Sequence, residues 1–434
     1  MEGTRVFVKS FGCSTNLADG EVLAGCLVEA GHELVEDIEA ADVIIYNTCA
    51  VKGPTENRMI MILKRVPSDK KLIVAGCLPL INLERLRKEV SFDGILGPAA
   101  GGRIVDYVKR VLNNEKIIAL EGAVNAKPSL DLPRLRVNRI IGVVPINYGC
   151  LGSCTYCCVV FARGRLRSYL VQEIVKKVKI DLSSGVREFW ITSQDTAGYG
   201  RDIGTDLAGL LKVLCDIEGD FRIRVGMMTP NLAKDILECL TEAFQSEKIF
   251  KFIHLPVQSG DNEVLKHMQR YYLVDDFKDV VNAFRASFPD ITLATDVICG
   301  FPGETEKAFE RTLRLIEEVQ PDIVNISKFF ARPRTAAAEM QEDFVPPQEI
   351  KRRSGITTKL VKKIIVKRNK RWIGWTGEVF IDEVGKVPCS WIGRNFAYKP
   401  VVLKDANPND LIGKTLRLKV VKAPATYLEG EIVK

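Results

Sequence analysis

RIIGVVPINYGCLGSCTYCC occupies residues 139–158 and joins a predicted strand to a loop with four cysteines in nine residues. The strand is an apolar run of the kind that is buried in a parallel sheet. Five similar runs follow along the chain, each succeeded by a helical pattern. They span residues 186–192, 221–227, 251–257, 291–299 and 322–330. Six such units are too few for a closed eight-unit barrel, so they predict a partial (β/α)6 barrel.

The cysteines of the opening loop indicate a metal centre. Cys150, Cys154 and Cys157 form C-x3-C-x2-C at the end of the first barrel strand, where β/α barrels build active sites. Three neighbouring thiolates suit an iron–sulfur cluster or zinc. Three ligands on a four-iron cluster would leave one iron open to bind a small molecule. Cys158 should point away from Cys157, and we do not expect it to be a ligand.

A second cysteine set lies near the N-terminus. Strands predicted at residues 6–11, 42–47 and 71–76 alternate with helical patterns, which indicates a doubly wound α/β domain with a parallel sheet. Cys13, Cys49 and Cys77 each follow one of these strands. Because parallel strands end at one edge of the sheet, the three thiols should converge. They are ligands of a second centre or, alternatively, inert buried cysteines; Cys26 lies on an apolar helix face and should belong to the core.

Changes in composition and the positions of linker-forming residues divide the chain of 434 residues into three predicted domains. A linker with two prolines, residues 125–137, separates an N-terminal domain (1–124) from the barrel and a following helix (138–371). Short strands in residues 372–434 predict a small antiparallel β-barrel. No apolar run approaches the roughly 20 residues that span a membrane. The absence of a signal-peptide pattern and the twelve cysteines lead us to expect a cytoplasmic protein without disulfides.

The predicted helix at residues 347–371 is strongly basic. It contains ten Lys or Arg residues and one acid, Glu349, which favours a polyanionic partner and salt-sensitive binding. The small barrel adds aromatic residues among cations, suited to base stacking unless they fill its core; they are Trp372, Trp375, Trp391, Phe396 and Tyr398. The candidate RNA-binding residues are Lys362, Lys363, Lys367, Arg368, Lys370, Arg371 and Arg394.

These motifs resemble a known enzyme family. C-x3-C-x2-C with Tyr156 before the third cysteine resembles the radical S-adenosylmethionine (SAM) superfamily, and GCLGSCTYCCVVFARGRLRSY (residues 149–169) is similar to the methylthiotransferases within it. SFGCSTNLADGE (10–21), NTCAVKGPTEN (47–57) and VAGCLP (74–79) match the cysteine motifs of their N-terminal domain. WIGRNFAYKPVVL (391–403) and ATYLEGEIV (425–433) resemble the RNA-binding TRAM domain.

The resemblance implies two [4Fe–4S] clusters. Cys150, Cys154 and Cys157 would hold the cluster whose open iron binds SAM, and a flavodoxin-like N-terminal domain would hold an auxiliary cluster for sulfur at its three strand-end cysteines. The motif with DGE resembles the archaeal and eukaryotic branch. This implies conversion of N6-threonylcarbamoyladenosine at position 37 of tRNA to its 2-methylthio derivative by a 5′-deoxyadenosyl radical. The implied partners are the anticodon stem-loop, a flavodoxin- or ferredoxin-type electron donor and a sulfur source.

Other functions stay open on the sequence. Within the family these are action on isopentenyladenosine-37 or on a ribosomal-protein aspartate, and outside it a noncatalytic iron–sulfur RNA-binding protein. A noncatalytic binder would not need the polar and glycine-rich segments that follow the barrel strands, which fit a nucleoside-cofactor pocket. The candidate cofactor-binding residues are Tyr156, Gln194, Asp195, Gln258, Asp296, Gly300 and Glu304. Arg334 stands where the family usually has Gly and offers charge to a substrate phosphate; Cys215, Cys239 and Cys299 should be core residues.

Overall fold

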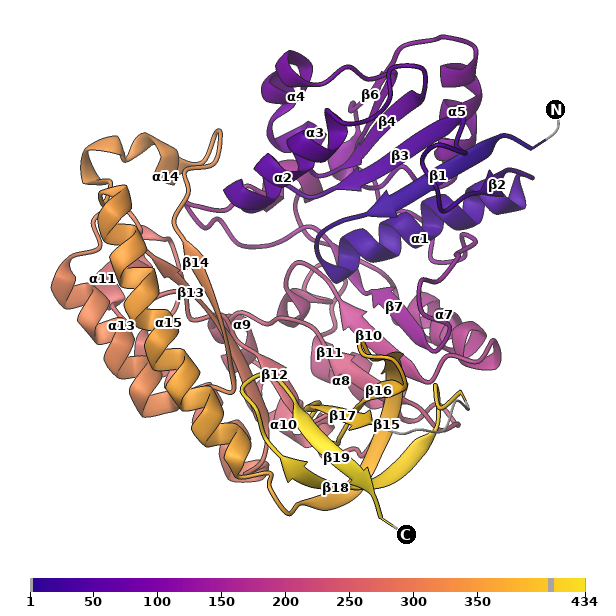
Figure 1. Ribbon diagram of the computed structural model, residues 1–434. Helices are drawn as coiled ribbons and strands as arrows, with labels where there is room; N and C mark the ends of the chain where they lie inside the picture. Colours follow the sequence, from indigo (N-terminus) through magenta and orange to yellow (C-terminus); the bar gives the residue numbers. More distant parts are fainter. Residues whose placement is uncertain (1–2, 405–409, 434) are drawn as a thin grey trace.

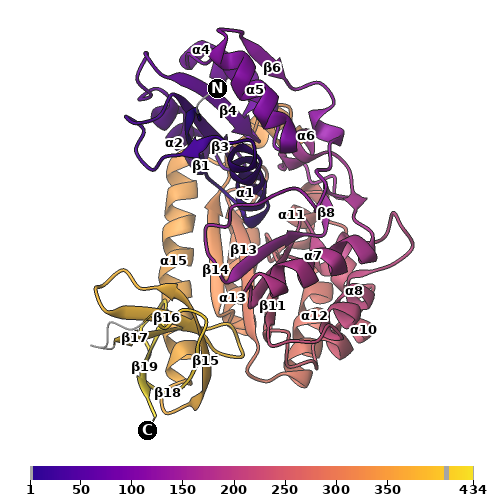
Figure 2. The ribbon, with the colours of Figure 1, turned by 90° about the vertical axis from the view of Figure 1, so that its right-hand side faces the viewer.

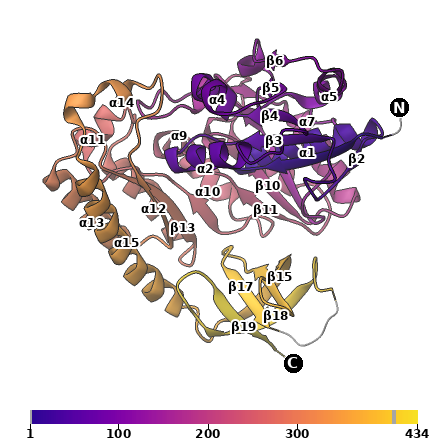
Figure 3. The same cartoon turned by 45° about the horizontal axis from the view of Figure 1, so that its top comes forward.

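The computed structural model describes residues 3–404 and 410–433 and has three parts (Figure 1). A parallel N-terminal sheet lies at one end, a small C-terminal barrel at the other, and a central parallel sheet between them. Figures 2 and 3 show the same order from other sides. The boundaries of the domains at residues 1–124, 138–371 and 372–434 stay predictions.

The N-terminal sheet has the strand order β2-β1-β3-β4-β5-β6, all parallel. Its strands are β1 Arg5–Ser10, β2 Glu33–Leu34, β3 Val43–Thr48, β4 Lys71–Gly76, β5 Gly94–Leu96 and β6 Ile117–Ala119. Helices α1 Ser14–Glu29 and α5 Ile104–Leu112 cover one face, and α2 Gly53–Leu63, α3 Leu78–Ile81 and α4 Leu83–Glu89 cover the other. Short 3-10 turns lie at Gly101–Arg103 and Ala123–Asn125. This is the predicted doubly wound, flavodoxin-like arrangement.

The central sheet follows the predicted partial (β/α)6 barrel. Its strands are β7 Ile141–Pro145, β10 Glu188–Thr192, β11 Arg222–Val225, β12 Phe252–His254, β13 Thr292–Cys299 and β14 Ile323–Lys328. They form two parallel three-stranded sheets, β7-β10-β11 and β12-β13-β14, joined by bridges such as Met227 to His254. Each strand corresponds to one of the six predicted runs. The short hairpin of β8 Asn147–Tyr148 and β9 Arg167–Ser168 closes the loop that carries Cys150, Cys154 and Cys157 at its base.

Most helices of this part pack on the central sheet, while α6 Val159–Arg163 packs against the N-terminal part through Ala162. The other helices are α7 Val171–Ser183, α8 Leu207–Cys215, α9 Pro230–Lys234, α10 Leu237–Ala243, α11 Asn262–His267, α12 Val274–Ser287, α13 Glu306–Val319 and α14 Ala336–Glu339, with 3-10 turns at Thr196–Gly198 and Gln341–Asp343. Cys299 is buried and Cys215 half-buried, as expected for core residues. Cys239 is exposed on α10, so its prediction as a core residue is wrong.

The C-terminal part is a closed five-stranded barrel with the order β15-β16-β17-β19-β18. Its strands are β15 Thr376–Val384, β16 Ser390–Arg394, β17 Pro400–Lys404, β18 Thr415–Lys422 and β19 Leu428–Ile432. All pairs are antiparallel except β17 with β19, which is parallel. The prediction of an antiparallel barrel therefore holds with this exception.

The basic helix α15, Pro347–Lys370, connects the central sheet to this barrel and packs on β14 and α13. It runs along the side of the molecule in Figures 1 and 2. Within the described residues, no helix combines the length and the apolar character needed to cross a membrane.

Candidate metal centres

The N-terminal cysteines come together at the carboxyl edge of the N-terminal sheet. Cys13 follows β1 and caps α1, Cys49 follows β3, and Cys77 follows β4 and caps α3. The Phe11 N–H donates to the Asn47 carbonyl and the Cys77 N–H donates to the Thr48 carbonyl, each at 2.9 Å, so the turns that carry the three cysteines lie side by side. Burial raises the pKa of Cys77 to about 12 and also raises the pKa of Cys49. Cys26 is buried on α1 in the core, as predicted.

Gly12 leaves space beside this set of thiols. Its φ is +114°, a region that side chains rarely adopt. A Cβ added at Gly12 would lie 2.6 Å from Cβ and 3.0 Å from Sγ of Cys49. Glycine at this position therefore keeps backbone close to the thiol without filling the space around it.

The second set lies on the loop that leaves the central sheet. The Cys150 backbone N–H donates to the Gly164 carbonyl at 3.1 Å, which holds the loop closed near the β8–β9 hairpin. Inside the loop, a Cβ on Gly152 would lie 3.4 Å from Sγ of Cys150 and 3.6 Å from Sγ of Cys154. Glycine thus keeps open the space between the two thiols. Burial raises the pKa of Cys150 to about 11 and raises the pKa of Cys157 further.

Arg270 supplies a cation to this second set. Its Nη1 donates to Sγ of Cys154 at 3.2 Å, and its Nε donates to the Tyr272 hydroxyl at 3.1 Å. A guanidinium in this position stabilises a thiolate by charge and by hydrogen bonding. Sequence reasoning missed Arg270 because it lies 116 residues beyond Cys154 and no spacing rule links the two.

Cys158 is turned away from its neighbours. It is buried in the hydrophobic core of the N-terminal sheet, where Ala162 also packs, and its thiol faces the Ala50 carbonyl at 3.9 Å. This position agrees with the expectation that Cys158 is not a ligand. It shows instead that the loop is anchored into the N-terminal part by an apolar side chain.

Both cysteine sets fit iron–sulfur clusters in donor type and in the space kept by glycine. No three His, Cys, Asp or Glu side chains are arranged about a single metal ion in the part of the chain that the structure describes. A four-iron cluster binds each thiolate through a different iron, so its ligands stand farther apart than those of one ion.

The two sets lie on adjoining edges of the two sheets. The Ser14 and Thr192 hydroxyls are 2.6 Å apart, so the start of α1 contacts the end of β10. Gln194 accepts from the backbone N–H of Gly149 at 2.7 Å and donates to Thr15 at 3.5 Å. Gln194 therefore holds the second cysteine loop against α1. Its predicted contact with a cofactor stays a prediction.

The Asp195 carboxylate joins the turn after β10 to the start of α9. One carboxylate oxygen accepts from the backbone N–H groups of Ala197 and Thr229, each at 3.2 Å, and the other accepts from the Thr229 hydroxyl at 2.6 Å. Burial raises its pKa. These contacts give Asp195 a structural role at the barrel mouth.

Asp296 and Gln258 lie on the inner side of β13 and next to it. Asp296 accepts from Asn325 at 2.6 Å and pairs with His254 at 3.1 Å. Although burial opposes ionisation, these hydrogen bonds lower the pKa of Asp296, so the carboxylate stays charged. Gln258 is half-buried with a φ of +66°, an unusual conformation for a non-glycine residue and one that is enriched at functional sites. Both remain candidates for contact with a nucleoside.

Gly300 and Glu304 both contact the basic helix, and their predicted role in cofactor binding stays a prediction. A Cβ on Gly300 would lie 2.4 Å from the Ile350 side chain, and Glu304 forms a buried ion pair with Arg353 at 2.8 Å. Both partners belong to α15. The glycine and the carboxylate therefore seat the basic helix. Tyr156 packs edge-on against Phe301, with ring centroids 6.3 Å apart, and joins the central core.

Most cations predicted to bind RNA are exposed on α15 or just after it, but two are not. Arg368 pairs with the buried Asp322 at 2.8 Å, and Arg394 pairs with Asp382 at 2.7 Å. Arg368 joins α15 to the start of β14, and Arg394 joins β16 to β15 within the C-terminal barrel. Both arginines therefore lie apart from the basic surface. The exposed cations are Lys362, Lys363, Lys367, Lys370 and Arg371.

The aromatic residues of the barrel divide between core and surface. Trp372 is buried in the barrel core and Trp375 and Trp391 pack against it, which confirms the alternative reading for Trp375. Tyr398 inserts into the central sheet, where its hydroxyl donates to Glu188 at 3.0 Å. Phe396 is 45% exposed and remains available for stacking.

Arg334 bridges two parts of the chain. Its φ is +64°, the conformation that glycine adopts most easily. Its guanidinium donates to the Leu80 carbonyl and lies 4.7 Å from the Phe161 ring. The guanidinium of Arg334 thus lies between the N-terminal and central parts of the chain. Its suggested contact with a substrate phosphate stays a prediction.

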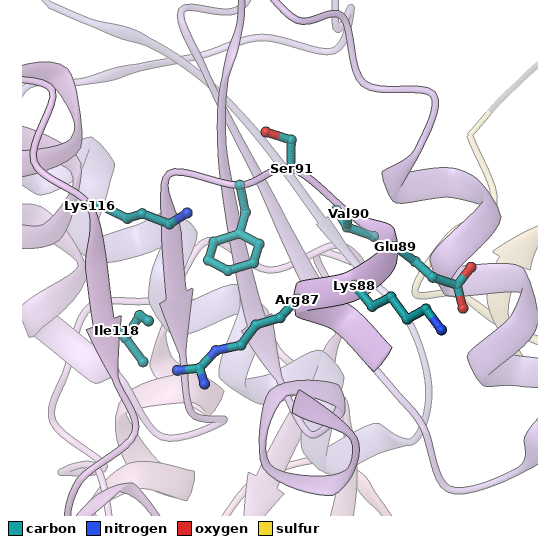
Figure 4. A pocket seen from close by; sticks show the side chains of 8 residues that line it. Arg87, Lys88, Glu89, Val90, Ser91, Lys116 and Ile118 are labelled. Carbon is teal, nitrogen blue, oxygen red and sulfur yellow. The ribbon is translucent and has the colours of Figure 1, made fainter. Parts of the chain in front are cut away.

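A surface hollow of about 660 Å³ lies away from both cysteine sets (Figure 4). It is found at the amino ends of β5 and β6, the opposite edge of the N-terminal sheet. Its lining is basic, and comprises Arg87, Lys88, Glu89, Val90, Ser91, Phe92, Lys116 and Ile118.

Three family models match the chain in order. The uncharacterized protein family UPF0004 matches residues 5–97, the radical SAM superfamily residues 144–316, and the TRAM domain residues 370–433. The second match covers the central sheet from the end of β7 through β13, without β14, and the third covers the closed barrel.

Solved structures with the same fold include a radical S-adenosylmethionine methyltransferase from Kitasatospora setae with cobalamin and a [4Fe-4S] cluster bound. The TM-score is 0.55 at 13% identity, over 77% of this chain and 74% of that chain. The cobalamin-dependent S-adenosylmethionine radical enzyme OxsB has a TM-score of 0.51 at 11% identity, over 81% and 56% of the two chains. At this level of identity the likeness shows the fold.

Relatives with much higher identity match nearly the full length. The probable threonylcarbamoyladenosine tRNA methylthiotransferase of Pyrococcus abyssi is 42% identical over 99% of both chains, and that of Methanothermobacter thermautotrophicus is 41% identical over 99% of both chains. The threonylcarbamoyladenosine tRNA methylthiotransferase of Homo sapiens is 34% identical over 99% of this chain and 74% of its own length. With two cysteine sets, the central fold and this end-to-end similarity, the chain belongs to the threonylcarbamoyladenosine tRNA methylthiotransferase family of radical SAM proteins.

Proposed function

We propose that the protein converts N6-threonylcarbamoyladenosine at position 37 of tRNA into its 2-methylthio derivative. The observation that carries the proposal is the pair of three-cysteine sets on adjoining edges of two parallel sheets. The first set, Cys13, Cys49 and Cys77, would hold an auxiliary [4Fe–4S] cluster, and the second, Cys150, Cys154 and Cys157, would hold the SAM-binding cluster. The names of the relatives supply the substrate.

Each bound group has a distinct task. When bound, the second cluster supplies the electron that releases a 5′-deoxyadenosyl radical from SAM, and the auxiliary cluster holds the sulfur that becomes the methylthio group. A radical is needed because no side-chain acid or base can remove the unreactive hydrogen from C2 of adenine. One SAM provides the methyl group and a second provides the radical. The electron comes from a flavodoxin- or ferredoxin-type donor, and the sulfur comes from a separate source.

The chain's own residues position these groups. Gln194 holds the second cysteine loop against α1, and Arg270 donates to Cys154. Asp296 keeps its charge at the inner face of the sheet, where we infer that it and Gln258 contact the nucleoside of SAM. A ribose hydroxyl is a suitable donor to such a carboxylate.

The anticodon stem-loop would lie on the exposed cations of α15. Phe396 of the C-terminal barrel would be available to stack on a base. A single-stranded anticodon loop can present base 37 unpaired, so that it can be splayed out and reached by the radical. A tRNA substrate also implies a cytoplasmic site of action.

Iron content tests the two clusters. Anaerobically reconstituted protein should hold about eight irons per chain, four for each cluster. Replacing Cys13, Cys49 and Cys77 with Ala should leave about four irons and preserve 5′-deoxyadenosine formation, while methylthio transfer is abolished. A wild-type protein that never exceeds four irons would contradict the auxiliary cluster.

A further inference from the structure

Arg163 is a buried cation between the two cysteine sets. It is the last residue of α6, directly after the second cysteine loop, and only 2% of it is exposed. Its Nη1 pairs with the Asp19 carboxylate at 2.6 Å, and its Nη2 donates to the Asn16 side-chain oxygen at 3.1 Å. The guanidinium also lies 5.5 Å from the Tyr148 ring. A charge this deeply buried is costly unless its surroundings compensate it.

The partners of Arg163 lead directly to the first cysteine set. Asn16 and Asp19 belong to α1, which Cys13 caps. The Asn16 amide donates to the Phe11 carbonyl and to the Asn47 carbonyl at 3.3 Å, so it ties together the ends of β1 and β3 just before Cys13 and Cys49. These contacts fix two cysteine-bearing turns relative to the guanidinium.

The same network reaches the second cysteine set. Tyr148 donates its hydroxyl to Asp19 and lies two residues before Cys150. The carbonyl of Gly164, next to Arg163, accepts from the backbone N–H of Cys150 at 3.1 Å. Arg163 is therefore attached to one cysteine loop by the backbone and to the other set by its side chain.

The guanidinium of Arg163 lies beside the turns that carry the first set of thiols. Through Asn16 it is hydrogen-bonded to the ends of β1 and β3, next to Cys13 and Cys49. In the second set, Arg270 is the cation that donates to Cys154. Each set of thiols thus has its own arginine nearby, buried in the case of Arg163 and half-buried in the case of Arg270.

We propose that Arg163 is a positioning residue that stabilises the negative charge of the auxiliary cluster and fixes its place beside the SAM-binding loop. This inference rests on the proposed auxiliary cluster. Three thiolates bring negative charge into a site where Cys49 and Cys77 are buried and Cys13 is exposed, and one added electron increases that charge. Nearby cations and hydrogen-bond donors favour the reduced form of an iron–sulfur cluster and thereby raise its reduction potential.

The test uses a protein that can hold only the auxiliary cluster, made by replacing Cys150, Cys154 and Cys157 with Ala. In this background Arg163 is compared with Arg163→Lys and Arg163→Gln. The readouts are iron per chain and the midpoint potential from an EPR-monitored redox titration. Arg163→Gln should lower the ratio of reduced to oxidised cluster about tenfold at a fixed potential, a midpoint shift of ~59 mV for one electron. Arg163→Lys should keep most of the wild-type potential.

A matched background separates this role from general damage to the fold. With Cys13, Cys49 and Cys77 replaced by Ala, only the SAM-binding cluster remains, and Arg163→Gln should leave its potential unchanged because Arg270 is still present. An equal shift in both backgrounds would overturn the proposal, as would unchanged potentials for all three residues at position 163.

Loss of iron is also informative. If Arg163→Gln loses the auxiliary cluster while Arg163→Lys retains four irons and the two apo proteins give the same circular dichroism spectrum, the need for a cation is supported. If both variants lose iron equally, the proposal is wrong. If the parent with Arg163 intact holds no iron, the auxiliary cluster itself is refuted, and with it the proposed function.

Discussion

At the scale of single residues, the thiols differ sharply in their surroundings. Cys150 and Cys154 face the space kept by Gly152, and Arg270 donates to Cys154, whereas the adjacent Cys158 is packed into an apolar core. Thiolates are stabilised by cations and by metal, and a thiol in an apolar core is not. The three cysteines of the motif and their neighbour should therefore respond very differently to substitution.

Cys150→Ala should abolish SAM cleavage, because a cluster that lacks one of its three ligands is lost or misplaced. Cys158→Ala is the matched control from the same loop. It should retain full iron content and 5′-deoxyadenosine formation, with a loss of unfolding free energy of about 1 kcal/mol from the lost packing. The measurement is 5′-deoxyadenosine per chain after reduction with dithionite. Continued cleavage by Cys150→Ala would show that the site assignment is wrong.

Glu188 provides a pH-dependent feature at the junction with the C-terminal barrel. Burial, followed by the charge of Asp382, raises the pKa of Glu188 to about 7. Trp190 and Tyr398 donate to one of its carboxylate oxygens, while Arg394 lies close enough to oppose the shift. The folded protein therefore favours the protonated acid.

The sign of the effect follows from this raised pKa. The contribution of Glu188 to stability is fully present below the unfolded pKa near 4.5 and is lost as the pH rises through about 7. Glu188→Gln mimics the protonated acid, so it should match the wild type near pH 4.5 and exceed its stability at pH 8 by up to about 3 kcal/mol. Thermal unfolding of the two apo proteins across this range measures the difference. A difference independent of pH would contradict the assigned pKa.

Residue positions could be predicted where a local rule applied. The strand-end cysteines follow from the alternation of strands and helices, since parallel strands end at one edge. Arg163 and Arg270 could not be assigned, because their partners at Asp19 and Cys154 are 144 and 116 residues away. Asp195 and Glu304 are candidate cofactor ligands because they are polar residues that follow strands. The sequence pattern alone does not show that the Asp195 carboxylate accepts from Thr229 or that Glu304 pairs with Arg353.

At the scale of elements, α15 serves two purposes on two faces. One face packs on the central sheet through Val361 and Ile364 and through the ion pairs of Arg353 and Arg368. The other face carries exposed lysines toward solvent, next to the C-terminal barrel. The charge run lies on a helix, as predicted, and polyanion binding by that helix stays a prediction. The run could not show which cations lie inward, since their acidic partners Glu304 and Asp322 are remote in sequence.

Neutralising the outward cations should weaken tRNA binding and its salt dependence. Replacing Lys362, Lys363, Lys367 and Lys370 with Gln removes up to four phosphate contacts, so the slope of log K against log salt should fall by up to about 3. Fluorescence anisotropy with tRNA at several salt concentrations measures this slope. The fold should be unaffected because the four side chains are exposed.

The control carries three changes of the same kind far from α15. Lys88→Gln, Lys109→Gln and Lys116→Gln replace exposed lysines of the N-terminal part, two of which line the basic hollow in Figure 4. These variants should bind tRNA with the wild-type slope. If they reduce the slope as much as the α15 variants, binding is a response to net charge and α15 is not the RNA surface.

At the scale of the whole molecule, the arrangement places two cysteine-bearing sheet edges against each other and the C-terminal barrel at the far end of α15 (Figures 1 and 2). Contacts from α1 to β7 and β10, and the buried pair of Glu56 with Arg332, join the N-terminal part to the central sheet. The architecture thereby keeps the two candidate clusters adjacent, as a reaction that combines their products requires.

The fold of each part could be predicted, but the joins between parts could not. Hydrophobic periodicity gave the doubly wound sheet, the six central strands and α15, because each is set by local pattern. The parallel pairing of β17 with β19, the insertion of Tyr398 into the central sheet and the bridge from Arg334 to Leu80 all depend on tertiary contacts. No periodicity within one segment encodes them.

The most direct test of the central claim is mass spectrometry of tRNA nucleosides from cells that lack the gene. The account predicts that 2-methylthio-N6-threonylcarbamoyladenosine disappears and that N6-threonylcarbamoyladenosine accumulates in its place. Expression of the wild-type gene should restore the methylthio nucleoside, whereas a gene with Cys13, Cys49 and Cys77 replaced by Ala should not. An unchanged level of 2-methylthio-N6-threonylcarbamoyladenosine in the deletion strain, or full restoration by the triple variant, would contradict the account.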